Sequence, residues 1–484
     1  MNVLLMQSYF RCYDPKEWQR DMPYPPLGDL YLSTVLKKNN LTVSFFDGML
    51  ANSVDEGLEF INSNSGSVLL LYDDEFNYLT KMCLSNMRET SKSLIQLAKS
   101  KGLKVGVSSS DATDHSDFYL NAGADVVFVG EAEQSVLNWI QNLDEKSNWE
   151  SVNGIRFLKE GQIYQTQSQK QIDNLDDLPD PDYDLIDIEK YRSIWKKKSG
   201  YFSLNVSTTR GCPFHCNWCA KPIYGQVYHN HSAERVAKLF SDLKQKYQVD
   251  HIWITDDIFG LKPGWLEAFQ VELEKKNVKI PYKCLSRADL IVKGNTAAQL
   301  ASTGCEIVWI GAESGSQKIL DAMDKGTKVE QIYEATELLR TNKVKIAFFL
   351  QFGYSGENYS DILLTRKMVR ELVPDDIGIS VSYPLPGTKF YERIKTRLGE
   401  KQNWQHSDDL EMMFDGTYTS HFYRHLYKVV HREYRLKKWI KNCSNGKIKL
   451  FESVKVITGS LLLIYDRFKL NRMKISSLRK IVNS

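Results

Sequence analysis

The sequence predicts an α/β protein with two successive parallel sheets, followed by a helical, basic C-terminal extension. Short apolar segments typical of buried strands alternate with amphipathic helical segments up to about residue 383. Prolines and acidic residues interrupt this alternation near residue 180. We therefore expect four parts, which cover residues 1–145, 146–200, 201–395 and 396–484.

The first part contains five strand candidates and two clear helix candidates. The strands are expected at 2–6, 41–46, 67–72, 104–107 and 125–129, and the helices at 27–38 and 91–101. Strands that alternate with helices predict a doubly wound, Rossmann-like parallel sheet. Such sheets bind ligands beyond the carboxyl ends of their strands, so we expect a binding surface in loops 7–28, 73–80 and 108–116.

Residues 146–200 form the predicted linker. The segment NGIRFLKEGQIYQ predicts a small hairpin, and Pro179 and Pro181 in LDDLPDPDYDLIDIEKY predict a stiff, non-helical spacer. We expect this linker to join two modules without adding chemistry.

In the third part, six expected strands alternate with five expected helices. Strands are expected at 202–207, 251–255, 282–286, 306–310, 345–351 and 377–383, with helices at 233–247, 265–275, 297–302, 329–341 and 360–372. This alternation predicts a partial (β/α)6 barrel. The chemistry of barrels of this type lies at the carboxyl ends of the strands.

The loop after the first barrel strand carries three of the eight cysteines, in the run TTRGCPFHCNWC. Cys212, Cys216 and Cys219 are spaced as metal ligands, and three thiolates leave one position of a four-iron cluster open for another molecule. Zinc is the alternative, with His215, His229 or His231 as a fourth ligand. Cys284 and Cys305, on or before barrel strands, are interpreted as buried thiols.

The Cys-x3-Cys-x2-Cys spacing, with Trp218 before the last cysteine, resembles the cluster motif of the radical S-adenosylmethionine (radical SAM) enzymes. The resemblance implies that the three cysteines hold a 4Fe-4S cluster whose open iron binds S-adenosylmethionine (SAM). It also implies cleavage of SAM to a 5'-deoxyadenosyl radical.

Later strand ends resemble the SAM-binding elements of the same family. The motif WITDDIF would receive the SAM amino group, CLSRADLI the SAM carboxylate, IGAESGSQKILDAMDKG the ribose, and FLQFGYSGEN and SYPLPGTKFY the adenine. Carboxylates suit an ammonium, and the planar fork of an arginine suits a carboxylate. The cofactor-binding residues implied in this way are Trp218, Asp256, Asp257, Arg287, Glu313, Ser314, Gly353 and Glu357.

Two N-terminal segments, PYPPLGDLYLSTVLKKNNLTVSFFDG and AGADVVFVGEAEQSVL, resemble the cobalamin-binding domain of cobalamin-dependent radical SAM enzymes, which include anaerobic magnesium-protoporphyrin IX monomethyl ester cyclase. The resemblance implies cobalamin as a third cofactor. The region before residue 150 contains only His115 and no Asp-x-His-x-x-Gly motif that could ligate cobalt. It also carries Ser108-Ser109-Ser110-Asp111 where the family often has a glycine pair. An unliganded lid domain is the alternative.

The function implied by the resemblance is cobalamin-dependent radical methylation of an unactivated carbon in a small metabolite. One alternative is a cyclase or rearrangement enzyme that uses the same cofactors without methyl transfer. The other is a non-catalytic protein that binds zinc or cobalamin. A radical SAM enzyme also implies a reductant protein such as flavodoxin or ferredoxin.

Composition and charge bear on location and on the C-terminal extension. The apolar runs are too short to span a membrane, so we expect a cytoplasmic protein. Residues 421–484 contain sixteen Lys and Arg but three acidic residues, a net charge of +13. We expect this tail to be a helical cap over the substrate. Contact with an anionic membrane through residues 454–465 is the second interpretation, and nucleic acid is the least favoured partner.

Overall fold

The structure is a computed structural model that describes residues 1–73, 76, 84–221, 223–407, 410–444, 459 and 462–474. Most of the predicted binding loop 73–80 and much of the apolar segment 454–465 lie outside the described residues. The chain divides into two compact units. Unit 1 comprises 1–213, 221–284 and 403–409, and unit 2 comprises 214–220, 285–402 and 410–484.

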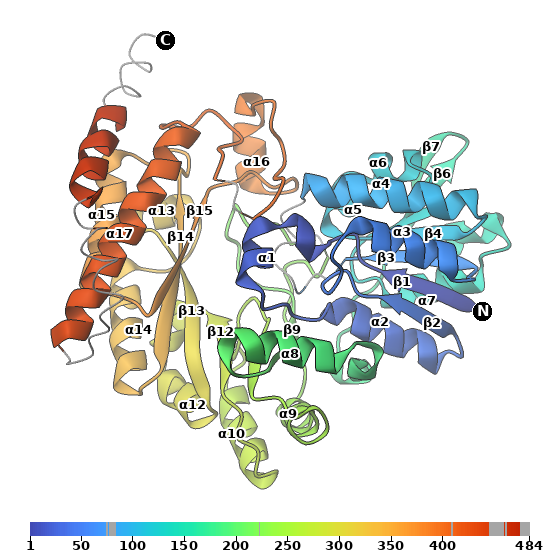
Figure 1. The fold of residues 1–484 in the computed structure, drawn as a ribbon, viewed down its shortest axis with the longest axis horizontal. Coiled ribbons are helices and arrows are strands. Elements are labelled where there is room, and N and C mark those ends of the chain that lie inside the picture. The colour runs from blue at the N-terminus through green and yellow to red at the C-terminus, as the bar shows by residue number, and fades with distance from the viewer. Residues whose placement is uncertain are drawn as a thin grey trace. The chain divides into compact units, whose positions relative to one another are not determined.

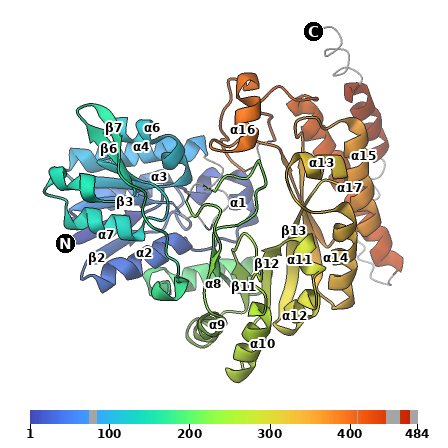
Figure 2. The same ribbon diagram turned by 180° about the vertical axis from the view of Figure 1, so that it is seen from behind.

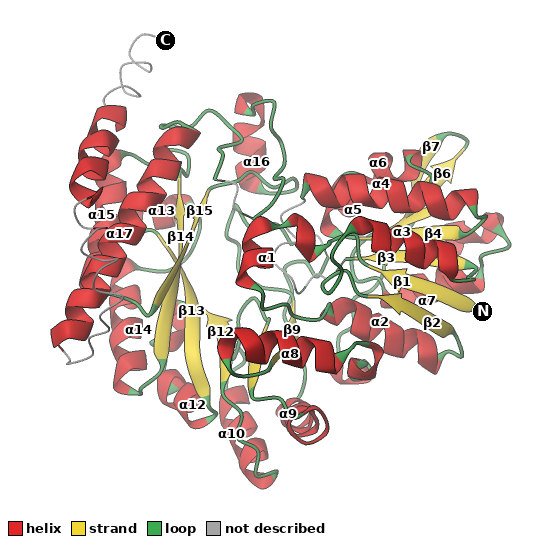
Figure 3. Ribbon diagram, viewed as in Figure 1, coloured by secondary structure: helices red, strands yellow, loops and turns green. Residues whose placement is uncertain are grey.

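Unit 1 contains a seven-stranded sheet of order β2-β1-β3-β4-β5-β6-β7 (Figures 1 and 3). Its strands are β1 (Asn2–Met6), β2 (Thr42–Phe46), β3 (Val68–Tyr72), β4 (Lys104–Ser108), β5 (Val126–Phe128), β6 (Ile155–Lys159) and β7 (Gln162–Gln165). The first five strands are parallel, and β6 and β7 add the predicted hairpin as an antiparallel edge. The predicted hairpin is therefore part of this sheet.

Helices cover both faces of this sheet, as predicted for a doubly wound fold. The helices of residues 1–145 are α1 (Pro15–Arg20), α2 (Leu27–Lys38), α3 (Val54–Ser63), α4 (Ser85–Ser100), α5 (Ser110–Asp114), α6 (Ser116–Asn121) and α7 (Glu133–Gln141). Within β3, Val68 and Leu70 pack with α2 and α7, whereas Leu69 and Leu71 pack with α3, α4 and α6. Alternate residues of one strand thus belong to two separate apolar cores.

The linker corrects one prediction, because α8 (Ile188–Ser199) is a regular helix within the segment expected to be non-helical. The Asp187 side chain accepts a hydrogen bond from the Lys190 backbone N–H, and Gly200 ends the helix with a φ of 81°. Tyr191 and Trp195 are buried. Pro179 and Pro181 restrict the chain only before this helix begins.

The second sheet is the predicted partial barrel, with the strand order β15-β14-β13-β12-β11-β8 (Figure 2). Its strands are β8 (Ser203–Val206), β11 (His251–Ile254), β12 (Tyr282–Ser286), β13 (Cys305–Glu313), β14 (Lys345–Phe352) and β15 (Asp376–Val381). A two-stranded ribbon joins β9 (Thr209–Arg210) and β10 (His229–Asn230). The boundary between the two units falls within β12.

The helices that follow the barrel strands agree with the predicted pattern. Unit 1 contributes α9 (Ala233–Tyr247) and α10 (Trp265–Lys275). Unit 2 contributes α11 (Ala288–Ile291), α12 (Thr296–Ser302), α13 (Gln317–Ala322), α14 (Val329–Thr341), α15 (Tyr359–Leu372), α16 (Lys389–Ile394) and α17 (Ser420–Ser444). Residues 462–474 are also helical. Among the described residues, none of the helices has the length and apolar character needed to cross a membrane.

The core of the first sheet gives a test of the fold. Leu70 is 1% exposed in the central strand β3, whereas Ile163 on the edge strand β7 is 44% exposed. We expect Leu70→Ala to lower the free energy of unfolding by about 2–5 kcal/mol, because it leaves a cavity between packed layers. Ile163→Ala should change it by less than about 0.5 kcal/mol. Urea unfolding followed by circular dichroism measures both, and equal losses would contradict the observed register.

Candidate functional site

The loop that leads to the first cysteine is held by Asp256, which follows strand β11. Its buried carboxylate accepts hydrogen bonds from the Thr208 and Thr209 backbone N–H groups, at 2.7 and 3.1 Å, and from the Thr208 hydroxyl. Burial raises the pKa of Asp256 to about 7. Asp256 is predicted to bind SAM, but its carboxylate oxygens accept hydrogen bonds from the loop. The neighbouring Asp257 is exposed.

Gly211 and Cys212 continue this loop in unit 1. Gly211 has a φ of 80°, and a Cβ atom there would collide with the Val227 carbonyl oxygen, so no other residue fits without a shift of the backbone. Cys212 is buried, and the Lys221 ammonium donates a hydrogen bond of 2.9 Å to its carbonyl oxygen. The position of this cysteine is thus fixed from both sides.

Arg210 ties the same loop to the end of the first sheet. Its guanidinium pairs with the Glu131 carboxylate and, at 2.6 Å, with the Glu133 carboxylate, and all three side chains are buried. The rings of Tyr31 and Tyr224 lie 5.5 and 5.0 Å from the guanidinium carbon. The GEAEQ segment after β5 therefore holds the residue two positions before Cys212.

Two of the three histidines proposed as zinc ligands contact the linker. His231 Nδ1 lies 3.2 Å from the Asp176 carboxylate, and His229 Nδ1 lies 3.1 Å from the Asp173 carbonyl oxygen. Burial lowers the pKa of His231 to about 4. His215 is exposed on the cysteine turn of unit 2.

Cys216 and Cys219 lie in a turn of unit 2 that Asn217 anchors. The Asn217 side-chain amide donates to the Ala322 carbonyl oxygen at 2.8 Å and to Asp324, and its oxygen accepts from the Tyr354 hydroxyl at 2.7 Å. Its backbone N–H donates to the Met323 carbonyl oxygen at 3.0 Å. Asn217, which the sequence reasoning missed, therefore positions the residues on either side of it.

Glu313 and Arg287 meet charged partners inside unit 2. The Lys325 ammonium donates to Glu313 Oε1 at 2.8 Å. Burial acts to lower the pKa of Lys325, but the nearby Glu313 and Cys216 raise it above its usual value. Arg287 pairs with Asp289 at 2.8 Å and lies 3.6 Å from the Phe214 ring centre. A buried cation that sequence reasoning missed, Lys325, thus lies near the second cysteine.

Ser314 and Glu357 are also engaged within unit 2. The Ser314 hydroxyl lies 3.0 Å from the Thr365 hydroxyl on α15. Glu357 Oε2 accepts a hydrogen bond of 2.6 Å from the Gly353 N–H, and Oε1 is buried without a hydrogen-bond partner. Burial raises the pKa of Glu357 to about 8, so this carboxyl group is mostly protonated at neutral pH.

Trp218 lies edge-on to Tyr383 at the end of the last barrel strand, with ring centres 6.3 Å apart. Its indole N–H is buried without a partner in the protein. Over the described residues, no three His, Cys, Asp or Glu side chains form a ready metal site. Metal binding by the cysteines therefore rests on their spacing and on the donor chemistry of three cysteine thiols.

The carboxyl edge of the first sheet forms a second polar region. Its order places a switch point between β1 and β3, where sheets of this topology bind ligands. Asp73, which follows β3, accepts hydrogen bonds from the N–H and the hydroxyl of Ser8, which follows β1, at 2.7 and 2.6 Å. These bonds link the ends of the two strands at the switch point. Ser109 lies in the segment 108–111, where the family often has a glycine pair. Its hydroxyl caps α5 by accepting a hydrogen bond from the Ala112 N–H. Gln7 Nε2 and Glu133 Oε2 are buried without a partner.

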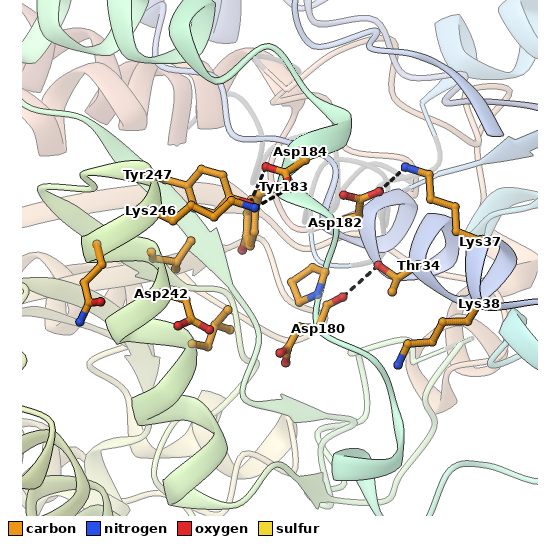
Figure 4. Close-up of a pocket in the computed structure, with 14 residues that line it drawn as sticks. Thr34, Lys37, Lys38, Asp180, Asp182, Tyr183, Asp184, Asp242, Lys246 and Tyr247 are labelled. Atoms are coloured by element: carbon orange, nitrogen blue, oxygen red, sulfur yellow. Dashed lines mark hydrogen bonds and ion pairs between the residues drawn. The ribbon is translucent and has the colours of Figure 1, made fainter. Parts of the chain in front are cut away.

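A surface groove of about 770 Å³ in unit 1 is separate from these residues (Figure 4). It is lined by α2, the linker at 180–184 and the C-terminal half of α9. Lys37 pairs with Asp182 at 2.6 Å, and Tyr247 donates to Asp184 at 2.9 Å. None of the predicted site residues lines it, and two pairs of its charged side chains bind each other, namely Lys37 with Asp182 and Lys246 with Asp184.

Residues 206–369 match the family model of the Radical SAM superfamily. This match, the parallel partial barrel and the three-cysteine loop show a radical SAM domain in residues 206–369. Together with relatives named as a methyltransferase and a cyclase, the match supports an enzyme over a non-catalytic binding protein.

The relatives and structural neighbours narrow this class. The chain is 24% identical to an uncharacterised methyltransferase of Pyrococcus horikoshii, over 79% of this chain and 81% of the relative. It is 25% identical to the anaerobic magnesium-protoporphyrin IX monomethyl ester cyclase of Rubrivivax gelatinosus, over 57% of this chain and half of the cyclase.

The fold is shared with two solved enzymes. The cobalamin-dependent SAM radical enzyme OxsB, solved with aqua-cobalamin, superposes with a TM-score of 0.72 at 14% identity, over 100% of this chain and 80% of OxsB. The radical SAM methyltransferase TsrM of Kitasatospora setae, solved with cobalamin and a [4Fe-4S] cluster, gives 0.66 at 15%, over 81% and 77%.

Glu357 predicts a dependence of stability on pH. Between its ordinary pKa of 4.5 and about 8, the folded chain keeps a proton that the unfolded chain has lost. Raising the pH through this window should therefore destabilise the wild type relative to Glu357→Gln, by at most about 1.4 kcal/mol per pH unit. Thermal unfolding from pH 5 to 8 measures this difference. The exposed Glu337→Gln is the control, and parallel curves for wild type and Glu357→Gln would contradict the burial.

Arg210 predicts a large loss of stability. Arg210→Met should lower the free energy of unfolding by about 3–5 kcal/mol, because it leaves Glu131 and Glu133 buried without a counter-charge. Adding Glu131→Gln and Glu133→Gln to this variant should restore much of the lost free energy of unfolding. Arg20→Met, whose guanidinium is 36% exposed beside Glu17, should cost less than about 1 kcal/mol. Equal losses for the two single variants in urea unfolding would disprove the buried network.

Proposed function

We propose that this enzyme transfers a methyl group to an unactivated carbon of a small molecule, using a 4Fe-4S cluster, SAM and cobalamin. The observation that carries the proposal is the three-cysteine loop at the carboxyl end of the first strand of a radical SAM half-barrel. Methyl transfer is favoured because a relative that aligns over 79% of the chain is named an uncharacterised methyltransferase.

The residues proposed to hold the cluster are Cys212, Cys216 and Cys219. Their thiols fit an iron–sulfur cluster, since none of them forms a disulfide. The cluster, when bound, supplies the electron that cleaves SAM. The chain's own part is positional: Asp256 holds the backbone before Cys212, and Asn217 holds the turn of Cys216 and Cys219.

We propose the same SAM-binding residues as the sequence does. Their surroundings in the structure differ. Asp257 is exposed beside the loop of Asp256, and the Trp218 indole N–H is a buried donor without a protein partner. Arg287, Glu313 and Ser314 already have partners within the protein, so they would bind SAM by sharing or exchanging these hydrogen bonds.

Cobalamin fits the polar edge of the first sheet. Its corrin ring is surrounded by carboxamides, which both donate and accept hydrogen bonds. Gln7 Nε2 offers a buried donor and Glu133 Oε2 a buried acceptor at that edge. Cobalamin, when bound, supplies the methyl group. We propose these two side chains as contacts of its periphery, with no histidine from a cobalt-binding motif below the ring.

Cyclisation without methyl transfer is the second candidate, because the chain also aligns with the ester cyclase over 57% of its length. Both candidates take a small-molecule substrate and a reductant protein such as flavodoxin or ferredoxin. They differ in their products from SAM.

The test is an anaerobic assay of the reconstituted protein with iron, sulfide, cobalamin, reductant and SAM. We expect both 5'-deoxyadenosine and S-adenosylhomocysteine, and we expect Cys216→Ala to lower 5'-deoxyadenosine at least 100-fold because it removes a cluster ligand. Cys443→Ala, on α17, is the control and should leave both products unchanged.

5'-Deoxyadenosine without S-adenosylhomocysteine would favour the cyclase candidate. Neither product from protein that contains iron and binds SAM would contradict the proposed chemistry.

A further inference from the structure

We propose that the helix at residues 462–474 docks the enzyme on an anionic membrane surface. This inference concerns where the enzyme works, and it is independent of the chemistry proposed above. It rests on an exposed apolar face, on a buried ion cluster that fixes the orientation of that face, and on the surrounding positive charge.

The helix has two faces of different character. Leu463, Asp466 and Leu470 recur at helical spacing and are buried. The remaining side chains include four large apolar residues that are exposed by 50, 72, 61 and 61%, namely Leu462, Ile464, Tyr465 and Phe468. A cluster of this kind on a short helix marks an interaction site rather than a solvated surface.

Ion pairs hold the helix with this face outward. Asp466 pairs with Arg432 on α17 and lies 3.6 Å from His425. Arg467 pairs at 2.6 Å with Glu433 on α17, and the same buried carboxylate accepts from Arg366 on α15 at 2.6 Å. The Tyr359 hydroxyl donates to the Asn471 side-chain oxygen at 2.9 Å. Turning the apolar face inward would break these buried pairs.

The positive charge selects an anionic partner. Lys469 and Arg472 belong to this helix, and the guanidinium of Arg472 lies 5.8 Å from the Phe468 ring centre. Glu433 and Asp466 are buried in ion pairs, so they do not offset this charge at the surface. Cations beside exposed aromatic and aliphatic side chains are typical of helices that lie in the interface of an anionic bilayer.

A bilayer fits better than a second copy of the chain. Two copies joined through this face would bring Lys469 and Arg472 of one copy close to the same cations of the other. A bilayer of anionic lipids neutralises that charge and accepts the apolar side chains. Because none of the described helices can span a membrane, the contact would be peripheral.

The experiment is co-sedimentation of the full chain with vesicles of phosphatidylcholine containing 30% phosphatidylglycerol, compared with pure phosphatidylcholine. We expect binding to the anionic vesicles in 50 mM NaCl that falls at least tenfold in 500 mM NaCl. The variant Ile464→Ser/Tyr465→Ser/Phe468→Ser should bind at least tenfold more weakly. Lys469→Glu/Arg472→Glu should also bind more weakly and lose much of the salt dependence.

The matched control is Leu363→Ser/Leu364→Ser, which removes two leucines exposed by 41 and 45% on α15 and should bind like the wild type. Circular dichroism and Tm should match the wild type for every variant used. No binding to anionic vesicles at low salt, or undiminished binding of the triple variant, would overturn the proposal. A dimer seen by sedimentation velocity and abolished by the triple variant, without vesicle binding, would assign the face to a second copy.

Discussion

The site depends on buried polar side chains that hold a loop with little apolar surface of its own. Residues 207–219 are mostly small or polar, so hydrophobic burial alone cannot fix them. Asp256 satisfies the backbone N–H groups of Thr208 and Thr209 on one side. Asn217 is bonded to residues 322–324 and to Tyr354 on the other. Each end of this segment is thus held by buried polar groups of its own unit, and on the Asp256 side the hydrogen bonds compensate for burying a carboxylate.

Adjacent residues of one sequence motif have different surroundings in the structure. Asp256 and Asp257 are adjacent in WITDDIF, yet the first is buried beneath the loop and the second is exposed. In the same way Ser314 bonds to Thr365, whereas its neighbour Glu313 pairs with Lys325 near Cys216. One residue of each pair thus bonds to a neighbouring loop or helix, whereas the other is exposed or pairs with a buried ammonium.

Local patterns predicted the fold far better than they predicted the supports of the site. The sequence predicted α9, α10, β12 and α14 to the residue, because strong periodicity and clear boundaries define them. It missed α8, since two prolines outweighed the helical pattern that follows them. Lys325, Arg210 and Asn217 were missed as functional residues because their partners Glu313, Glu131 and Ala322 lie 12 to 105 residues away. Pairs this far apart in the sequence leave no local spacing pattern. The three cysteines could be recognised because they lie within eight residues.

The basic C-terminal segment makes two kinds of contact within unit 2. Met412, before α17, and Tyr423, in the first turn of α17, lie against the loop after β14, because a Cβ on Gly353 would lie 2.8 Å from Met412 Sδ and 3.1 Å from the Tyr423 ring. Farther along α17, Glu433 forms ion pairs with Arg366, Arg370 and Arg467. These pairs hold helices together, so part of the positive charge is neutralised within the protein. Lys469 and Arg472 lie on the helix that carries the exposed apolar side chains of residues 462–474. The residues of the extension that contact α15 and the loop after β14 therefore differ from those that form the exposed face, so substitutions in the two sets should act independently.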